Sequence, residues 1–241
     1  TVMGYQAAQN ATAGGTVAIG HSSAKNNTGA GITAVGSNAL VTNTSGTSST
    51  GIGTNALNDN TTGGYNVALG RNALYSNTTA NNNTAVGYAA LNLNTTGTQN
   101  VALGQSAASS TTTGGQNTAV GTNALNSNTT ASNNTALGYQ AAYSNTTGTE
   151  VTAVGKSAMS SNTTGNYNTA VGYQTMLNNT TGSDNTAYGD ESLRSNTSGG
   201  KNTVSGNIAL YANTTGSQNT AFGMQALRYN TTASNNTAVG Y

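Results

Sequence analysis

Apolar and polar positions recur along this chain with one short period. A glycine closes each Thr-Ala-Val-like group, and these anchor glycines follow one another at a constant interval from Gly36 through Gly53 to Gly240. The first three, Gly4, Gly20 and Gly36, are spaced one position more closely. The chain therefore consists of about fourteen consecutive turns of one unit, with the consensus N-T-A-V-G-Y-Q-A-L-x-S-N-T-T-G-x-x.

The unit carries two apolar rows. A large apolar residue usually precedes the anchor glycine, as at Val86 and Leu103, and a second follows four residues after it, as at Leu91 and Leu125, with a row of Ala before that one. Thr-Ala-Val alternation flanked by Asn and Gly predicts short strands of about four residues between turns. A helix is disfavoured because each unit holds two Gly, runs of Asn and Thr, and β-branched residues.

The polar positions are equally regular. An Asn-Thr-Thr or Asn-Thr-Ser group lies in the middle of each unit, a Gly or Ala follows it, and a second Asn precedes the Thr-Ala-Val group. In a parallel coil each residue type stacks on itself at about 4.7–4.9 Å. Asn suits such stacking because its amide both donates and accepts hydrogen bonds, and Asn and Gly tolerate left-handed corners. The sequence predicts an all-β protein, a parallel β-solenoid of about fourteen coils of 16–17 residues, with residues 1–241 as a single repeat array.

The composition predicts a small hydrophobic core. The chain holds 45 Thr, 38 Asn and 32 Gly among 241 residues, and only 5% of its residues are charged. Two large apolar side chains per unit bury little area against the entropy of ordering a whole coil. We therefore expect self-association, as a homotrimer or a filament, with the Ala-rich face buried between chains.

The same composition argues against several partners. A net charge of +1 gives no electrostatic footprint for nucleic acid. No stretch approaches the ~18 apolar residues of a membrane span. The absence of Cys excludes disulfides and thiolate metal sites, and five acidic residues cannot line a row of hard-cation sites.

Catalytic chemistry has few candidates. His21 is the only His, and we interpret it as a solvent-facing residue of an early turn. Asp190 and Glu191 are adjacent and would face opposite sides of a strand, which does not support a glycosidase carboxylate pair. The densest charge cluster is interpreted as a solvated patch or, alternatively, as a local partner contact; it comprises Asp184, Asp190, Glu191, Arg194 and Lys201. We predict no catalytic residue, no cofactor and no metal site, and hence no enzyme.

Eleven Asn-Thr-Thr or Asn-Thr-Ser groups are also N-glycosylation acceptor motifs. They are Asn43, Asn60, Asn77, Asn94, Asn128, Asn145, Asn162, Asn179, Asn196, Asn213 and Asn230. One interpretation is that Asn and Thr serve ladder and corner geometry and the motif is a by-product. The other is a glycan-coated surface.

Tyrosines occupy two positions of the unit. They follow the anchor glycine at Tyr5, Tyr88, Tyr139 and Tyr173, and stand four positions further on at Tyr75, Tyr143 and Tyr211. They either pack at the coil edge with the hydroxyl in water or form a sugar-stacking or interface surface.

The repeat resembles a known class of fibre sequences. Asn117–Gly121 and Asn219–Gly223 are similar to the repeats of trimeric autotransporter adhesin heads. Asn134–Gly148 and Asn168–Gly182 resemble more closely the N-T-A-x-G-Y-x-A-L-x-x-N-T-T-G repeats of phage tail fibres and large bacterial surface proteins. This resemblance, which covers essentially the whole chain, implies a trimeric β-roll used as a shaft or adhesive head.

The sequence thus favours a structural or adhesive repeat shaft of an extracellular filament or a virion-surface fibre. Its expected place is extracellular, on a cell surface or on a virion, and its expected partners are other copies of itself and cell-surface glycans or a receptor. Because neither end has an atypical capping turn, we expect a segment of a longer fibre. The alternatives are an ice-binding solenoid that uses Thr and Asn ladders and, less favoured by the few acids, a glycan depolymerase.

Overall fold

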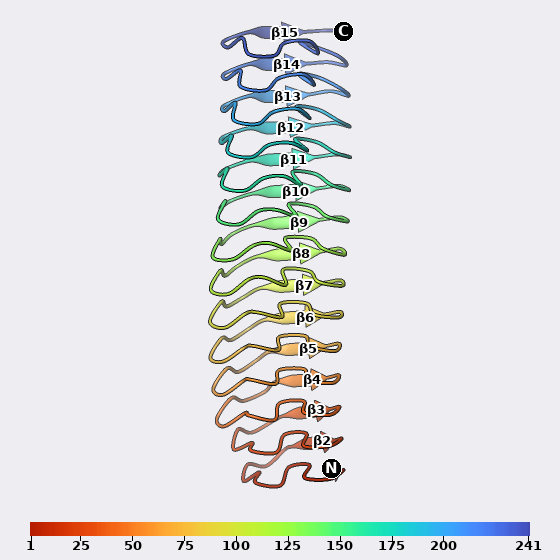
Figure 1. Cartoon of the computed structure of the whole chain (residues 1–241), viewed down its shortest axis with the longest axis vertical. Coiled ribbons are helices and arrows are strands. Elements are labelled where there is room, and N and C mark those ends of the chain that lie inside the picture. The colour runs from red at the N-terminus through yellow and green to blue at the C-terminus, as the bar shows by residue number, and fades with distance from the viewer. The chain divides into compact units, whose positions relative to one another are not determined.

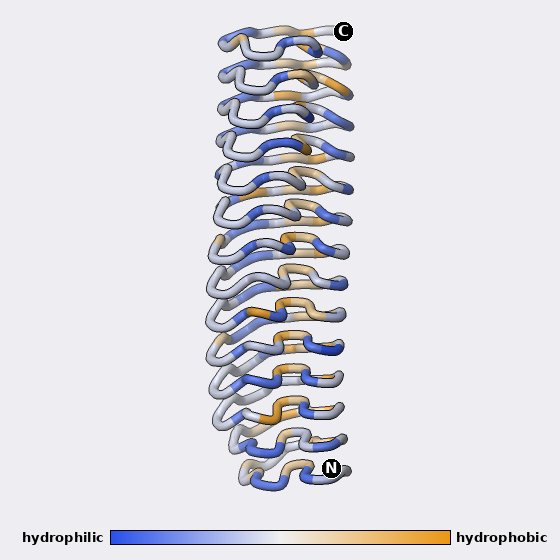
Figure 2. Tube along the Cα trace, viewed as in Figure 1, coloured by the Kyte–Doolittle hydropathy of each residue, from blue (hydrophilic) through white to orange (hydrophobic).

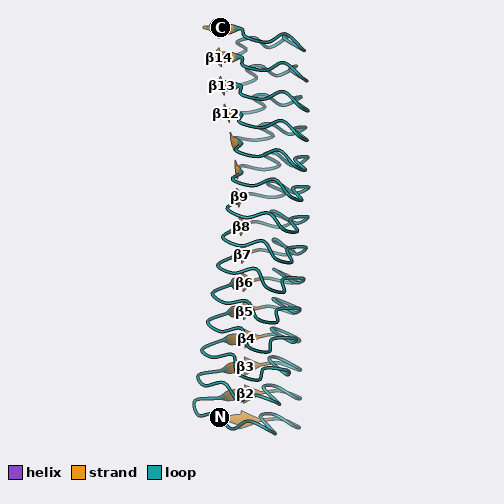
Figure 3. Ribbon diagram, turned by 90° about the vertical axis from the view of Figure 1, so that its left-hand side faces the viewer, coloured by secondary structure: helices purple, strands orange, loops and turns teal.

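The computed structural model describes residues 1–241 and confirms the predicted fold class. The chain is an all-β, parallel β-solenoid of about fourteen turns and has no helix (Figure 1). Its contacts divide it into an N-terminal unit, Thr1–Asn117, and a C-terminal unit, Thr118–Tyr241. Within each unit every coil contributes one strand to a parallel column, and turns make up the rest of the coil (Figure 3). The homotrimer remains a prediction.

The strands are shorter than the sequence predicts: β1 has two residues and the others have three. The N-terminal unit holds β1 (Val2–Met3), β2 (Val17–Ile19), β3 (Thr33–Val35), β4 (Thr50–Ile52), β5 (Val67–Leu69), β6 (Thr84–Val86) and β7 (Val101–Leu103). The C-terminal unit holds β8 (Thr118–Val120), β9 (Thr135–Leu137), β10 (Thr152–Val154), β11 (Thr169–Val171), β12 (Thr186–Tyr188), β13 (Thr203–Ser205), β14 (Thr220–Phe222) and β15 (Thr237–Val239). Each strand from β2 to β14 ends at an anchor glycine whose φ lies between +121° and +145°, which turns the chain out of the extended conformation.

Neighbouring strands pair in register by coil position. In the C-terminal unit Thr152 pairs with Thr169, and Ala153 pairs with Ala170. A shift by one residue would turn every side chain of a strand to the other face. The constant period of the repeat therefore keeps one set of side chains inside throughout the column.

The apolar part of the interior is built from small residues and, in most coils, one larger side chain. The middle residue of each strand points inward and is Ala in most coils, as Ala153 and Ala170 with 0% exposure show. A second buried Ala and a buried Leu or Met follow on the turn, as at Ala158 and Met159. Figure 2 shows that hydrophobic positions recur at the same places from coil to coil.

This arrangement overturns the expectation that self-association buries an Ala-rich face. The Ala rows already lie inside, and the large apolar residue before the anchor glycine points outward, as Leu69 does with 45% exposure. The reason is the alternation of faces along a strand: when the middle residue points inward, its two neighbours must point outward.

Two ladders of buried Asn complete the interior and confirm the predicted stacking. In the first ladder, Asn60 Nδ2 donates to Asn43 Oδ1 of the preceding coil at 2.6 Å and to the Gly63 carbonyl of its own coil at 2.9 Å. In the second, the backbone N–H of Asn83 donates to Asn66 Oδ1 at 3.0 Å. Asn83 Nδ2 donates to a carbonyl of the next coil, that of Gly97, at 2.9 Å. The amides are buried yet satisfied, which removes the usual cost of polar burial.

The Asn-Thr-Thr-Gly corner has its own hydrogen-bond pattern. The carbonyl oxygen of Thr78 accepts from the backbone N–H groups of Thr61 at 2.9 Å, Thr62 at 3.1 Å and Gly63 at 3.3 Å. It also accepts from the Thr61 hydroxyl at 3.0 Å. The first Thr of each group therefore ties its corner to the next coil, and its hydroxyl is used internally.

Left-handed backbone is more widespread than the sequence predicts. Besides the anchor glycine, most coils hold three non-glycine residues with positive φ, such as Ala89 (+54°), Leu91 (+50°) and Gln99 (+60°). For an L-residue other than Gly or Asn this conformation costs about 1–2 kcal/mol. The core Leu row adopts it because the left-handed turn directs these side chains to the interior, where Leu91 has 0% exposure.

The anchor glycines are required by the close approach of consecutive coils. A Cβ on Gly155 would lie 2.3 Å from the carbonyl oxygen of Gly172, at a φ of +131°. We expect Gly155→Ala to lower the free energy of unfolding by about 3 kcal/mol or more, measured by urea denaturation. Gly14→Ala is the matched control, since a Cβ there has no atom within 4 Å; equal stability of the two variants would contradict this account.

The first Asn ladder has one defect. Asn94 Oδ1 is buried and has no hydrogen-bond partner, because the next coil places Thr111 where the ladder elsewhere has Asn. We expect Thr111→Asn to raise the free energy of unfolding by about 1 kcal/mol, since it supplies the missing amide donor. The control is Thr113→Asn, at an exposed position on the same corner. An unchanged or lower urea midpoint for Thr111→Asn would refute the prediction.

Candidate functional site

The most distinctive surface is the outer strand face, formed by the first and third residues of each strand. The third position is apolar or aromatic in every strand from β2 to β15 except β13, which has Ser205; the Leu, Tyr and Phe side chains there are exposed, whereas most of the Val side chains are half-buried. In the N-terminal unit Leu69 is 45% and Leu103 is 47% exposed; in the C-terminal unit Leu137 is 47% and Phe222 is 60% exposed. Exposed apolar rows of this kind mark interaction surfaces more often than isolated apolar residues do.

In strands β5 and β7 of the N-terminal unit both outward-facing residues are apolar. Val67 and Leu69 of β5, and Val101 and Leu103 of β7, are all at least 40% exposed. Strand β6 pairs in register with both of these strands and lies between them. The third column is therefore apolar across β5–β7, through Leu69, Val86 and Leu103, whereas Thr84 separates Val67 from Val101 in the first column.

In the C-terminal unit the first strand position is Thr in every coil. The in-register column comprises Thr118, Thr135, Thr152, Thr169, Thr186, Thr203, Thr220 and Thr237. It runs beside the apolar column of the third position. This part of the face therefore presents hydroxyls and apolar groups side by side at the coil spacing.

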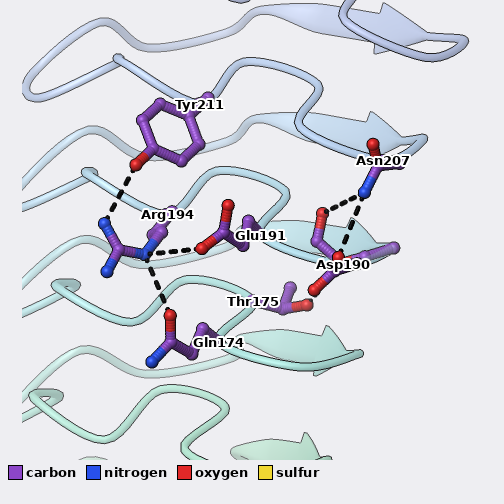
Figure 4. Close-up of polar contacts among 8 residues, drawn as sticks. Gln174, Thr175, Asp190, Glu191, Arg194, Asn207 and Tyr211 are labelled. Carbon is purple, nitrogen blue, oxygen red and sulfur yellow. Dashed lines mark hydrogen bonds and ion pairs between the residues drawn. The ribbon is translucent and has the colours of Figure 1, made fainter.

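The predicted charge cluster divides into two places. Arg194 Nε lies 3.4 Å from Glu191 Oε1 and donates to Gln174 Oε1 at 3.3 Å (Figure 4). Its Nη1 donates to the Tyr211 hydroxyl at 3.0 Å. Arg194 thus links three consecutive coils, while Asp184 and Lys201 lie along a separate polar groove with Ser183, Ser217 and Gln218.

The expectation that Asp190 and Glu191 face opposite sides of a strand is wrong. Strand β12 ends at Tyr188, and both carboxylates lie on the turn after Gly189. Asp190 Oδ2 accepts from Asn207 Nδ2 at 3.2 Å, whereas Glu191 faces Arg194 (Figure 4). The two carboxylates consequently have different partners.

Other titratable groups show no convergent arrangement. His21 is exposed and stacks on Tyr5, with ring centroids 5.5 Å apart. Burial raises the pKa of Asp59 above its ordinary value. No group of three or more His, Cys, Asp or Glu side chains could hold a metal ion. The structure contains no helix long and apolar enough to cross a membrane.

The tyrosines that follow an anchor glycine lie outside. Tyr5, Tyr88, Tyr139 and Tyr173 are between 44% and 71% exposed. Lys156 Nζ lies 5.8 Å from the centroid of the Tyr173 ring. Tyr75, Tyr143 and Tyr211 are half-buried. The first group therefore presents aromatic faces to solvent.

The candidate glycan acceptors form the first Asn ladder. All but Asn230 have 0% exposure, and Asn230 is half-buried. Asn162 shows the pattern: its Nδ2 donates both hydrogens, to Asn145 Oδ1 at 2.7 Å and to the Gly165 carbonyl at 3.0 Å. A glycan would replace one of these hydrogens and would have to fit inside the coil. The ladder interpretation accounts for these positions, and a glycan could be added only before the coil closes.

The first strand position shares the outer face with the third, which was not among the predictions from the sequence. The alternation of Thr-Ala-Val contains this signal, because residues i and i+2 of a strand lie on one side. Leu93 was also overlooked. It is 47% exposed on the turn of its coil, at a position where most coils have Ser, Asn or Thr.

Comparison with protein-family models and with curated proteins finds no match for this chain. The fold and the surfaces described above are accordingly the basis for assigning a function.

Proposed function

We propose that this chain is the structural and adhesive repeat shaft of an extracellular filament or a virion-surface fibre, and that copies of it associate laterally through the outer strand face. The observation that carries the proposal is the row of large apolar side chains exposed on that face. Repeat solenoids use extended surfaces of this kind for binding.

The energetics of the coil support lateral association. Most coils bury one Leu or Met and one or two Ala residues, while the large apolar side chain before the anchor glycine stays partly or largely exposed. Burying a Leu or Phe side chain contributes about 1.5–3 kcal/mol. Since exposed residues such as Leu69, Leu103, Leu137 and Phe222 recur along the row, covering it with another copy adds this contribution several times.

The composition is suited to a surface exposed to varied conditions. The chain has few charges and no Cys, so its stability depends little on ionic strength or on the redox state of the surroundings. Its cohesion comes from backbone and Asn hydrogen bonds. These properties fit a shaft that works outside the cell.

Native mass tests the association. Light scattering coupled to size exclusion is expected to give about 71 kDa for three chains of 23.8 kDa, or a polydisperse polymer. Replacing Leu69, Leu103 and Leu137 together by Thr should shift the mass to that of one chain, because three exposed apolar anchors are lost while strand propensity is kept.

Leu93→Thr is the matched control for this experiment. Leu93 is as exposed as Leu103 and Leu137, at 47%, but lies on a turn outside the outer strand face. It should leave the native mass unchanged. A monodisperse monomer of the unmodified chain, or an equal effect of the control, would refute lateral association through this face.

Ice binding is the second candidate, and the uninterrupted Thr column of the C-terminal unit favours it. Eight Thr residues stand at one coil position, and in five of the eight strands the neighbouring outward residue is Val or Leu. If this column binds ice, the chain will produce thermal hysteresis, and Thr152→Lys with Thr186→Lys will abolish it. Absence of hysteresis and of ice shaping would eliminate this candidate.

A further inference from the structure

A groove interrupts the turn surface of the N-terminal unit, on the coils that begin at Gly70, Gly87 and Gly104. It has a volume of about 330 Å³ and is lined by Asn72, Tyr88, Ala89, Asn92, Leu93, Ser106, Ser109 and Ser110. It lies on the turns that follow β5, β6 and β7. It is therefore separate from the outer strand face.

The groove lies beside a coil that departs from the repeat. Leu93 projects from a position that is Ser, Asn or Thr in most coils, and Ser110 occupies the same position one coil later. The backbone N–H of Leu93 donates to the Ser109 carbonyl at 3.0 Å, which fixes the two turns against each other. Large side chains on one coil above small ones on the next leave the surface hollow.

The groove is lined by apolar side chains on one part and by neutral polar side chains on the other. Tyr88 and Leu93 are 49% and 47% exposed and supply an aromatic ring and an aliphatic side chain. Serine hydroxyls and Asn amides line the remainder. Asn92 is held in place by its Nδ2, which donates to the Asn72 carbonyl at 3.1 Å. Apart from the Tyr88 phenol, no lining side chain is ionisable.

This chemistry selects a class of ligand. An aromatic face next to neutral hydroxyls and amides complements a molecule that has C–H faces on one side and hydroxyls around its rim. A neutral pyranose sugar has that character. An anion or cation would enter without a countercharge and would lose solvation. The volume is at the lower end of the range for small-molecule sites, which suits one or two sugar rings.

We propose that this groove is a binding site for neutral saccharides, in which the Tyr88 ring stacks on the C–H face of a pyranose and the serine hydroxyls and Asn amides bind its hydroxyls. This site supplies a ligand class for the adhesive role that is proposed above. In that respect the inference rests on the proposed function. The structural shaft does not require it.

Saturation-transfer NMR with maltotriose, cellotriose and tri-N-acetylchitotriose, all of them neutral, tests the site. At least one of these sugars should receive saturation from the protein, with a dissociation constant in the millimolar range because the groove is open and holds one aromatic ring. Tyr88→Ala should weaken binding about fivefold. Ser110→Leu should abolish it by filling the groove, and the coil tolerates Leu at this position, as Leu93 shows.

The matched control is Tyr139→Ala. Tyr139 occupies the same coil position as Tyr88 and is 48% exposed, but does not line the groove; its replacement should leave binding unchanged. Absence of transfer to all three sugars, retention of binding in both groove variants, or an equal loss in the control would overturn the proposal. Native mass measured on the same samples reports lateral association separately, so the failure of one proposal is distinguishable from that of the other.

Discussion

The stacking of each coil on the next, at a single fixed spacing, is the constraint on which the whole structure depends. Strand pairing, the two Asn ladders and the corner carbonyls all join residues of the same coil position, or nearly so, in adjacent coils. A buried polar position therefore needs a side chain that can form hydrogen bonds with the equivalent side chains of the coils before and after it. Asn meets this need because its amide donates toward one neighbour and accepts from the other.

The same constraint explains why much of the interior is polar and why the anchor glycines do not vary. Consecutive anchor glycines approach so closely that a Cβ on Gly138 would lie 2.5 Å from the Gly155 carbonyl oxygen. The narrow coil accommodates Ala on the strand and one Leu or Met on the turn. The remaining interior is filled by Asn, whose hydrogen bonds each contribute about 0.5–1.5 kcal/mol and whose removal leaves the neighbouring amide unsatisfied, as Asn94 shows.

A coil this narrow cannot bury all of its apolar residues. The residues that stay exposed form the face through which we propose that copies associate. The strand alternates faces, so the large residue before the anchor glycine must point to solvent when the middle Ala points inward. Exposure is thus a consequence of the fold, and it repeats along each unit. Local departures from the repeat have a different consequence. The Arg194 cluster links three coils, while Leu93, the exception at its coil position, borders a groove with the chemistry of a saccharide site.

The sequence by itself determined the period, the position of the strands, the parallel stacking and the Asn ladders, since each follows from residue types that recur at fixed intervals. It indicated that the Asn-Thr-Thr groups could serve corner geometry, and the burial of Asn162 and its equivalents agrees with that role.

Only the tertiary structure decided which apolar row faces inward, because both rows have the same period and the choice depends on the width of the coil. The left-handed conformation of Leu91, the different partners of Asp190 and Glu191 and the groove beside Tyr88 likewise depend on how adjacent coils meet in space. Residue type alone does not specify those contacts. Leu intrinsically disfavours the left-handed conformation. It adopts that conformation here because the interior is the only place where its side chain is buried.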